Sequence, residues 1–521
     1  MSDAAITSSP TTKVSKFAIP FLGLVAGLQG SMPNISSTAL VGASRALHMT
    51  GSTQALAASA QTLAIAATVI SAGLLADRLG RRHVLMVALV IATIGNLVVA
   101  LAPASGIYIL GMVITGCGLG AVYGCAFAYI KTVSSPGKLA GAMGTFTAAI
   151  MVSTVLLTFI GGSLTGINWR FAFVLIPVVA AILFFLVPVV LPKQDRITGT
   201  NTDLLGQLLL AAGVIAFLYS LSQFATSLTS PKTLVPLVAG VLLLAGFFIW
   251  ESKSEHNFFP VGLFRSPIFL AALAAGLIYN FGTAVAFLQV TNLWQYITGL
   301  KTSEVAVWQL PMLLAGIASG VIIGRLMVKG LSNRSAIVIG GFATIAGFIA
   351  LALAHSSKDF LAFLPGLVLG GGGVVIAAVP FGNLILRESP PRYLGPVSSS
   401  RTTAGQFFYT LGFSLSTVLI DRMTDGGVVK RLAEQGVPAN QLSTGLDAVN
   451  TYASAGTHAS TTLGKQALAD AATSYGNAFS VTMLLTAGIV FIATAAAFIW
   501  LRHGEGTPQP LTENEPTPAT A

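Results

Sequence analysis

Apolar runs of about twenty residues alternate with short polar stretches along almost the whole chain of 521 residues. A run of that length is what an α-helix needs to cross the hydrocarbon core of a bilayer. The pattern predicts an all-α polytopic membrane protein with fourteen spanning helices. We expect the spans near residues 17–40, 54–76, 83–103, 106–130, 139–163, 170–191, 204–224, 233–250, 267–290, 303–327, 335–354, 359–386, 395–420 and 476–501.

Two polar stretches interrupt the rhythm of short loops. Residues 193–203 form a connector after the sixth span, and residues 421–475 form a long outer segment rich in Ala, Ser, Thr and Gly. Within the latter, Gly427 to Gln435 could form a short amphipathic helix near the membrane surface. The tails at 1–16 and 502–521 are polar, and we expect the second to be disordered.

Composition agrees with a membrane location, since 54% of the residues are hydrophobic and only 8% are charged. The net charge of +10 does not indicate nucleic-acid binding, because the basic residues are dispersed one to three per loop and form no stripe. With the N-terminus inside, cytoplasmic segments hold seventeen of the 27 lysines and arginines, outer segments hold nine, and Arg401 lies in a span. This bias predicts a multi-pass protein of the cytoplasmic (inner) membrane with both termini in the cytoplasm.

Residues 73–85, between the second and third spans, concentrate ionisable groups in a short turn. Gly73 and Gly80 suit close helix packing and a turn conformation. A carboxylate such as Asp77 can lie at the positive N-terminus of a neighbouring helix, while an arginine meets carbonyls at a C-terminus. Such contacts could latch one helix bundle to another. The functional residues expected in this loop are Gly73, Asp77, Arg78, Gly80, Arg81 and Arg82.

The spacing Gly-x-Leu-x-Asp-Arg-x-Gly-Arg-Arg in this loop resembles the signature loop of the major facilitator superfamily, which is implicated there in the change between inward- and outward-open states. The stretches 258–265 and 294–299, Leu310-Pro311 and the four glycines from Gly370 are similar to the fourteen-span drug:proton antiporter branch. A weaker echo of the loop, Gly324-Arg325 with Lys329 and Gly330, falls in the second half.

This resemblance implies two six-helix bundles with a substrate cavity between them near the midplane. The bundles would be residues 17–192 and 267–501, joined by a connector and two linker spans at 193–266. It also implies alternating access and proton coupling. Three motif positions differ from the branch, with Gln29 in place of an acidic residue, Met112 in place of an arginine, and Leu157-Thr158 in place of Gly-Pro.

Proton coupling requires a titratable group that faces each side in turn, and carboxylates are nearly absent from the spans. Asp77 and Glu304 are the candidates, each with a structural role as the alternative. Arg401 lies about six residues into its predicted span, where an ionisable group is costly. It either reaches back to the cytoplasmic interface or faces the cavity, where it would favour anionic or strongly accepting substrates.

Uncharged polar residues in the spans could hydrogen-bond a ligand in a mostly apolar cavity. The alternative for each is a bond between helices. Gln29 and Asn34, which flank Pro33 in the first span, are the strongest candidates. The full set is Gln29, Asn34, Gln61, Gln207, Gln223, Asn280, Gln289, Asn383 and Gln406 with Tyr123, Tyr279 and Tyr409.

Glycines repeat every fourth residue in two spans and predict surfaces of close helix packing. The rows are Gly116, Gly120 and Gly124, and Gly316, Gly320 and Gly324. No phosphate-binding loop, metal-ligand spacing or hydrolytic triad is evident, so we expect no enzyme, metal or cofactor.

Three functions remain open from the sequence. The first is a secondary transporter that exports small organic or drug-like compounds; the second is a transporter or facilitator of one metabolite, which could be an anion taken up by the cell. The third is a membrane sensor or assembly partner that binds through residues 421–475. For a transporter we expect a small-molecule substrate, the proton and the lipid bilayer as partners, no nucleic acid, and a monomer.

Overall fold

The computed structural model describes residues 15–49, 51–135, 137–193, 203–224, 229–254, 257–295, 299–300, 302–455 and 460–502. These residues form helices and no strand. Nearly all of the predicted tails and most of the 193–203 connector lie outside the described residues.

Six helices from the first third of the chain pack together. α1 lies on α5, α2 and α3 both lie on α4, and α3 also contacts α6. Gly23 and Gly27 of α1 allow the approach to α5, where the Ser153 hydroxyl donates to the Leu24 carbonyl at 3.1 Å. The helices of this first group are α1 (Ala18–Ala46), α2 (Gly51–Leu79), α3 (Arg81–Ala100), α4 (Ser105–Val133), α5 (Leu139–Ile167) and α6 (Trp169–Val190).

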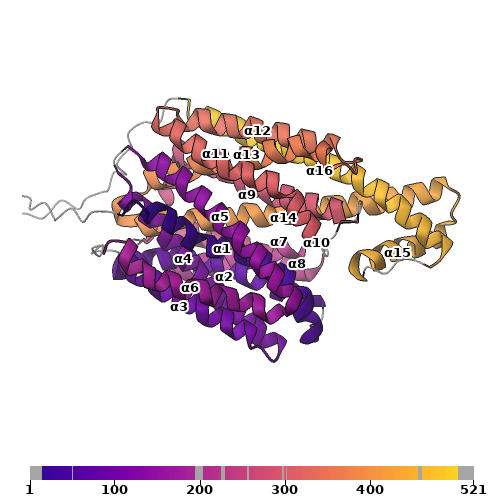
Figure 1. Cartoon of the computed structure of the whole chain (residues 1–521), viewed down its shortest axis with the longest axis horizontal. Helices are drawn as coiled ribbons and strands as arrows, with labels where there is room; N and C mark the ends of the chain where they lie inside the picture. The colour runs from indigo at the N-terminus through magenta and orange to yellow at the C-terminus, as the bar shows by residue number, and fades with distance from the viewer. Residues whose placement is uncertain are drawn as a thin grey trace, which may run out of the picture.

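Two further helices, α7 (Leu204–Gln223) and α8 (Pro231–Lys253), pair with each other, and α7 also contacts α2 and α14. A short 3₁₀ turn, Val261–Arg265, then leads into the second group, in which α9 contacts α13, α14 and α16. The helices of this second group are α9 (Pro267–Leu293), α10 (Thr302–Trp308), α11 (Leu310–Val328), α12 (Asn333–Leu353), α13 (Phe360–Glu388), α14 (Leu394–Glu434), α15 (Leu442–Ala455) and α16 (Thr462–Trp500). Figure 1 shows the two groups side by side.

Twelve of the described helices are long and apolar enough to cross a membrane. The predicted spans 17–40 and 395–420 fall in α1 and α14, which are 29 and 41 residues long but are not among the twelve. Both carry many buried polar side chains, such as Ser31 and Ser36 in α1 and Ser398 and Ser399 in α14. The count of fourteen spans therefore stays a prediction.

The predicted tenth span, 303–327, is wrong as a single helix. The structure divides it into α10 and α11 at Gln309, just before Pro311. Proline has no backbone N–H and its ring clashes with the preceding turn, which explains why a continuous helix does not form there.

The predicted loop-like segment 421–475 is largely helical. α14 continues without a break to Glu434, so the expected separate amphipathic helix at Gly427 to Gln435 is instead its last turns. α16 begins at Thr462, and Val428 and Leu432 of α14 pack against Ala467 and Ala471 of α16 in a small core of their own. These ends and α15 project beyond the other helices (Figure 1). We call this projection the α15 end.

Candidate functional site

The two helix groups meet along two seams at the end of the molecule opposite the α15 end, which we call the closed end. In the first seam α2 of the first group lies against α14 of the second. A Cβ added at Gly73 would stand 2.5 Å from the Gly395 carbonyl oxygen, so the two backbones touch at this point. Glycine at both positions is what permits the contact.

Asp77, one helical turn after Gly73, ties this seam with hydrogen bonds. Its Oδ2 accepts from the backbone N–H of Gly395 at 2.5 Å, in the first turn of α14. Its Oδ1 forms an ion pair with Arg81 at 2.7 Å, and Arg81 also donates to the Thr132 hydroxyl at 3.0 Å. Asp77 and Arg81 are 2% and 5% exposed. The carboxylate thus lies at the N-terminus of a neighbouring helix, as its sequence position predicts.

Gly80, Arg78 and Arg82 lie at the turn that follows this seam. Gly80 has φ of 92°, a conformation that side chains resist, and it separates α2 from α3. Arg78 and Arg82 are partly exposed beside it.

The second seam joins α5 of the first group to α11 of the second, and its closest contacts are made by glycines. A Cβ added at Gly144 would stand 2.9 Å from the Gly324 Cα, and Gly320 lies beside the same point. Two members of the predicted row in α11 therefore face the other group. In the row of α4, Gly116 packs against the Gln61 carbonyl and Gly120 against Ile65 within the first group, whereas Gly124 lies against both Val69 and Ser399 of α14.

A lysine that the sequence did not single out forms a third contact between the groups. Lys131, near the end of α4, donates to the backbone carbonyl of Ser389 at 2.9 Å. Ser389 is the C-cap of α13, where a positive charge is favoured. The sequence predicted that an arginine of the loop would meet such a carbonyl; among the described bonds Lys131 does so. The sequence feature that points to this contact is a basic residue in the last turn of a buried helix.

Arg401 lies between the two groups and is 4% exposed. A terminal nitrogen of its guanidinium donates a hydrogen bond to the Tyr123 hydroxyl of α4. The guanidinium carbon lies 4.8 Å from the ring centre of Phe127 and 4.9 Å from that of Phe381 in α13. This enclosure favours the interior placement of Arg401 over the interfacial one. Phe127 was not predicted, although its spacing of four from Tyr123 puts both rings on one face of α4.

Four of the predicted cavity residues already bond to the protein. Gln289 donates to Ser416 at 2.9 Å, Asn383 to Asn333 at 2.9 Å, Asn280 to the Gly276 carbonyl at 2.9 Å, and Asn34 to Thr158 at 3.5 Å. Three of these bonds join different helices, as the interhelical alternative predicts, whereas the bond of Asn280 lies within α9.

Three other candidates make no hydrogen bond with the described part of the chain. They are Gln29, Gln406 and Gln61, and both amide atoms of Gln61 are buried. A buried amide without a partner is costly, so Gln61 is a place where a ligand or water would be bound favourably. Glu304 is exposed in the first turn of α10, away from these residues in the described contacts.

The linker helices are fixed by two acidic residues that no functional prediction included. Oε1 of Glu251, at the end of α8, accepts from the backbone N–H groups of Phe258 and Phe259, both at 2.6 Å. Asp203 caps α7 through the Gly206 N–H and accepts from the Trp250 indole at 2.6 Å. This gives the Phe258-Phe259 motif a structural role, since its amides orient the approach to α9.

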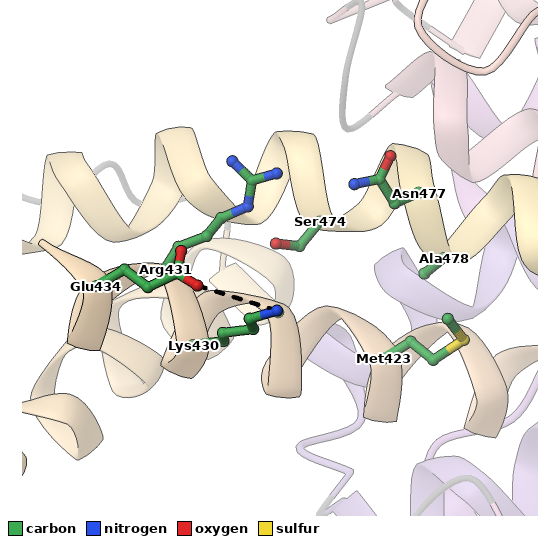
Figure 2. A pocket seen from close by; sticks show the side chains of 8 residues that line it. Met423, Lys430, Arg431, Glu434, Ser474, Asn477 and Ala478 are labelled. Atoms are coloured by element: carbon green, nitrogen blue, oxygen red, sulfur yellow. Dashed lines mark ion pairs between the residues drawn. The ribbon is translucent and has the colours of Figure 1, made fainter.

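A groove of about 360 Å³ lies between α14 and α16 near the α15 end. Figure 2 shows Lys430 paired with Glu434 at 3.9 Å on its rim, with Ser474 and Asn477 opposite. Farther toward the membrane helices, burial raises the pKa of Asp425 above its ordinary value, and Arg422 partly offsets this. The Lys430 and Glu434 side chains are largely exposed, so water solvates this groove.

Comparisons with known proteins agree with this arrangement. The multidrug resistance protein B homolog of Mycobacterium tuberculosis (strain CDC 1551 / Oshkosh) is 26% identical to this chain over the matched residues. The match covers 68% of this chain and 66% of that relative, so this chain spans about two thirds of the relative's length. The puromycin resistance protein pur8 of Streptomyces alboniger is 26% identical over 79% of this chain and 82% of its own length.

Solved structures show the same fold at low sequence identity. The proton:xylose symporter XylE has a TM-score of 0.58 at 13% identity, over 91% of this chain and 95% of that one. The human organic anion transporter MFSD10 has a TM-score of 0.55 at 14% identity, over 91% and 98%. Residues 21–413 match the sequence profile of the Major Facilitator Superfamily. Because this match spans well over half of the chain, the protein belongs to the Major Facilitator Superfamily of membrane transporters.

Proposed function

We propose that this protein is a secondary transporter that exports small organic, drug-like compounds by alternating access. The relatives named for multidrug and puromycin resistance support export of such compounds. The observation that carries the mechanism is the pair of seams at the closed end, where the two helix groups touch through glycines at Gly73–Gly395 and Gly144–Gly324. Contacts of this kind can separate and re-form as rigid groups tilt.

In this proposal the closed end faces the cytoplasm, as the loop arginines predict, and both termini lie on that side of the inner membrane. The α15 end then lies outside. The two groups are the moving bundles, α7 and α8 link them, and a monomer with fourteen spans suffices. The loop from Gly73 to Arg82 acts as the conformational switch.

We further propose that the proton gradient drives export and that Asp77, rather than Glu304, carries the coupling. Asp77 is buried between the two groups and bonds across the seam to Gly395. Opening of the seam would break this bond and admit water, so that Asp77 could exchange a proton with the solvent on that side. Glu304 is already exposed in the first turn of α10 in this closed arrangement.

The test is accumulation of fluorescent compounds in inverted membrane vesicles, with and without an imposed pH gradient. The panel contains cationic, neutral and anionic dyes of similar size. We expect gradient-driven accumulation of at least one class, and its loss in Asp77→Asn. The Glu304→Gln variant is the matched control, since it also removes one carboxylate and should keep the wild-type rate. Failure of the whole panel to accumulate would contradict export, and accumulation without any gradient would contradict proton coupling.

A further inference from the structure

Two arginines of the described helices are buried, Arg81 and Arg401. Arg81 pairs with the carboxylate of Asp77 at 2.7 Å. Arg401 instead contacts one neutral hydroxyl and aromatic rings, and no carboxylate of the described residues forms an ion pair with it.

The guanidinium of Arg401 leaves hydrogen-bonding capacity unused. Its Nε is buried and has no acceptor among the described residues. An arginine presents a planar array of donors that matches a carboxylate or another oxyanion in two-point contact.

The missing counter-ion is energetically significant. A charge taken out of water is stabilised when an opposite charge and good hydrogen bonds accompany it, and it is costly otherwise. The faces of Phe127 and Phe381 offset a part of the cost through cation–π attraction. These rings carry no oxygen acceptor for its N–H groups.

We infer that Arg401 binds the acidic group of the transported compound, and that the substrates include aromatic carboxylic acids. This inference rests on the proposed function, because it assumes that the protein transports the bound compound, and it names the substrate class. Tyr123 and Phe127 belong to one helix group while Arg401 and Phe381 belong to the other, so a bound acid would contact both groups. The rings supply an apolar surface for an aromatic skeleton, and the guanidinium supplies the charge.

The experiment measures binding, which does not require transport. Purified full-length protein in lipid nanodiscs is titrated calorimetrically with naphthoate, naphthylmethanol and naphthylmethylammonium, and empty nanodiscs provide the blank. These three probes share one skeleton and differ in charge. We expect naphthoate to bind at least about tenfold more tightly than the alcohol, which is the range for a hydrogen-bonded charge pair. The ammonium compound should bind most weakly.

Variants locate the effect. Arg401→Gln should bring naphthoate to within about threefold of the alcohol, and Arg401→Lys should keep part of the preference because it keeps the charge. Arg334→Gln is the matched control: Arg334 also stacks on a ring, that of Phe498 at 3.7 Å, but between α12 and α16. It should bind all three probes as the wild type does.

Two outcomes would overturn the inference: equal affinity of the wild type for naphthoate and the alcohol, or a naphthoate preference that survives in Arg401→Gln. The first needs no variant, so the test holds even if Arg401→Gln does not fold. Export of neutral dyes without naphthoate binding would reject the inference and leave the proposed function standing. Naphthoate binding through Arg401 without export of any compound would support the acid site and reject the function.

Discussion

The two seams at the closed end join the same helix groups but differ in chemistry. In the α2–α14 seam, backbone contact at Gly73 is accompanied by Asp77, which binds Arg81 and the start of α14. In the α5–α11 seam, backbone contact at Gly144 stands alone, and neither helix contains an acidic residue. Close approach is therefore common to both seams, whereas charge belongs to one.

The turns that follow α2 and α11 share a backbone conformation but differ in charge. Gly80 and Gly330 both have positive φ, 92° and 112°, and each ends its seam helix. Three residues before them stand Asp77 and the buried Met327. The second half of the chain thus repeats the turn and the glycine contact without the carboxylate. We infer that packing holds both seams, and that Asp77 makes one of them sensitive to charge.

The largest effect is expected from removing that charge. Asp77→Asn keeps the shape of the side chain but leaves Arg81 buried without its counter-ion, which should destabilise the closed end by roughly 3–5 kcal/mol. Electron paramagnetic resonance distances between spin labels at positions 138 and 329, in a background with Cys117 and Cys125 replaced by alanine, should shift to longer values. Adding Arg81→Gln should restore part of the closed population, because neither charge is then unpaired. No recovery in the double variant would show that the ion pair is not the cause.

A smaller effect is expected at the glycine seam. Gly144→Val places a side chain against the backbone of Gly320 and Gly324, which cannot rotate away, and should destabilise the seam by roughly 1–3 kcal/mol. The same spin-label distances and thermal unfolding would measure it. Gly166→Val, on the same helix with open space around its Cβ position, is the control. Equal behaviour of the two variants would mean that the seam does not depend on close approach.

The sequence predicts the parts of this picture that depend on local pattern. Apolar runs locate most helices, the fourfold spacing of glycines finds the packing faces, and the position of Asp77 after Gly73 anticipates its place at a helix N-terminus. The break at Gln309 was missed because the apolar run continues through Pro311, which interrupts the helix. The helical extension of α14 was missed because tertiary packing against α16 outweighs the weak helix propensity of a Ser/Thr/Gly-rich segment. Phe127 and Phe381 around Arg401 were missed because they come from helices in different groups, and their proximity is a property of the fold.

Lys131 should contribute less to the stability of the closed end than either seam does. Lys131→Gln removes one charged hydrogen bond to the Ser389 carbonyl at the end of α13, worth about 1 kcal/mol. We expect a shift of the spin-label distances in the direction of Asp77→Asn but smaller. Lys193→Gln removes an exposed lysine at the same end, next to Pro192 whose carbonyl accepts from Tyr129 of α4, and should leave the distances unchanged. If both lysine variants behave alike, a general loss of positive charge, and not the bond to α13, accounts for the change.

The smallest effect is expected at the α15 end. A variant there tests whether this end is a binding surface. Lys430 and Glu434 form their pair at 3.9 Å with side chains 78% and 63% exposed, and such pairs contribute less than about 1 kcal/mol. Lys430→Ala should therefore leave thermal unfolding and vesicle transport at wild-type values. Its control is Leu432→Ala, which removes a buried side chain from the core between α14 and α16 and should lower the unfolding temperature. Loss of a cellular phenotype in Lys430→Ala with normal vesicle transport would instead favour a partner-binding role for this end, because transport itself uses the seams and the groups between them.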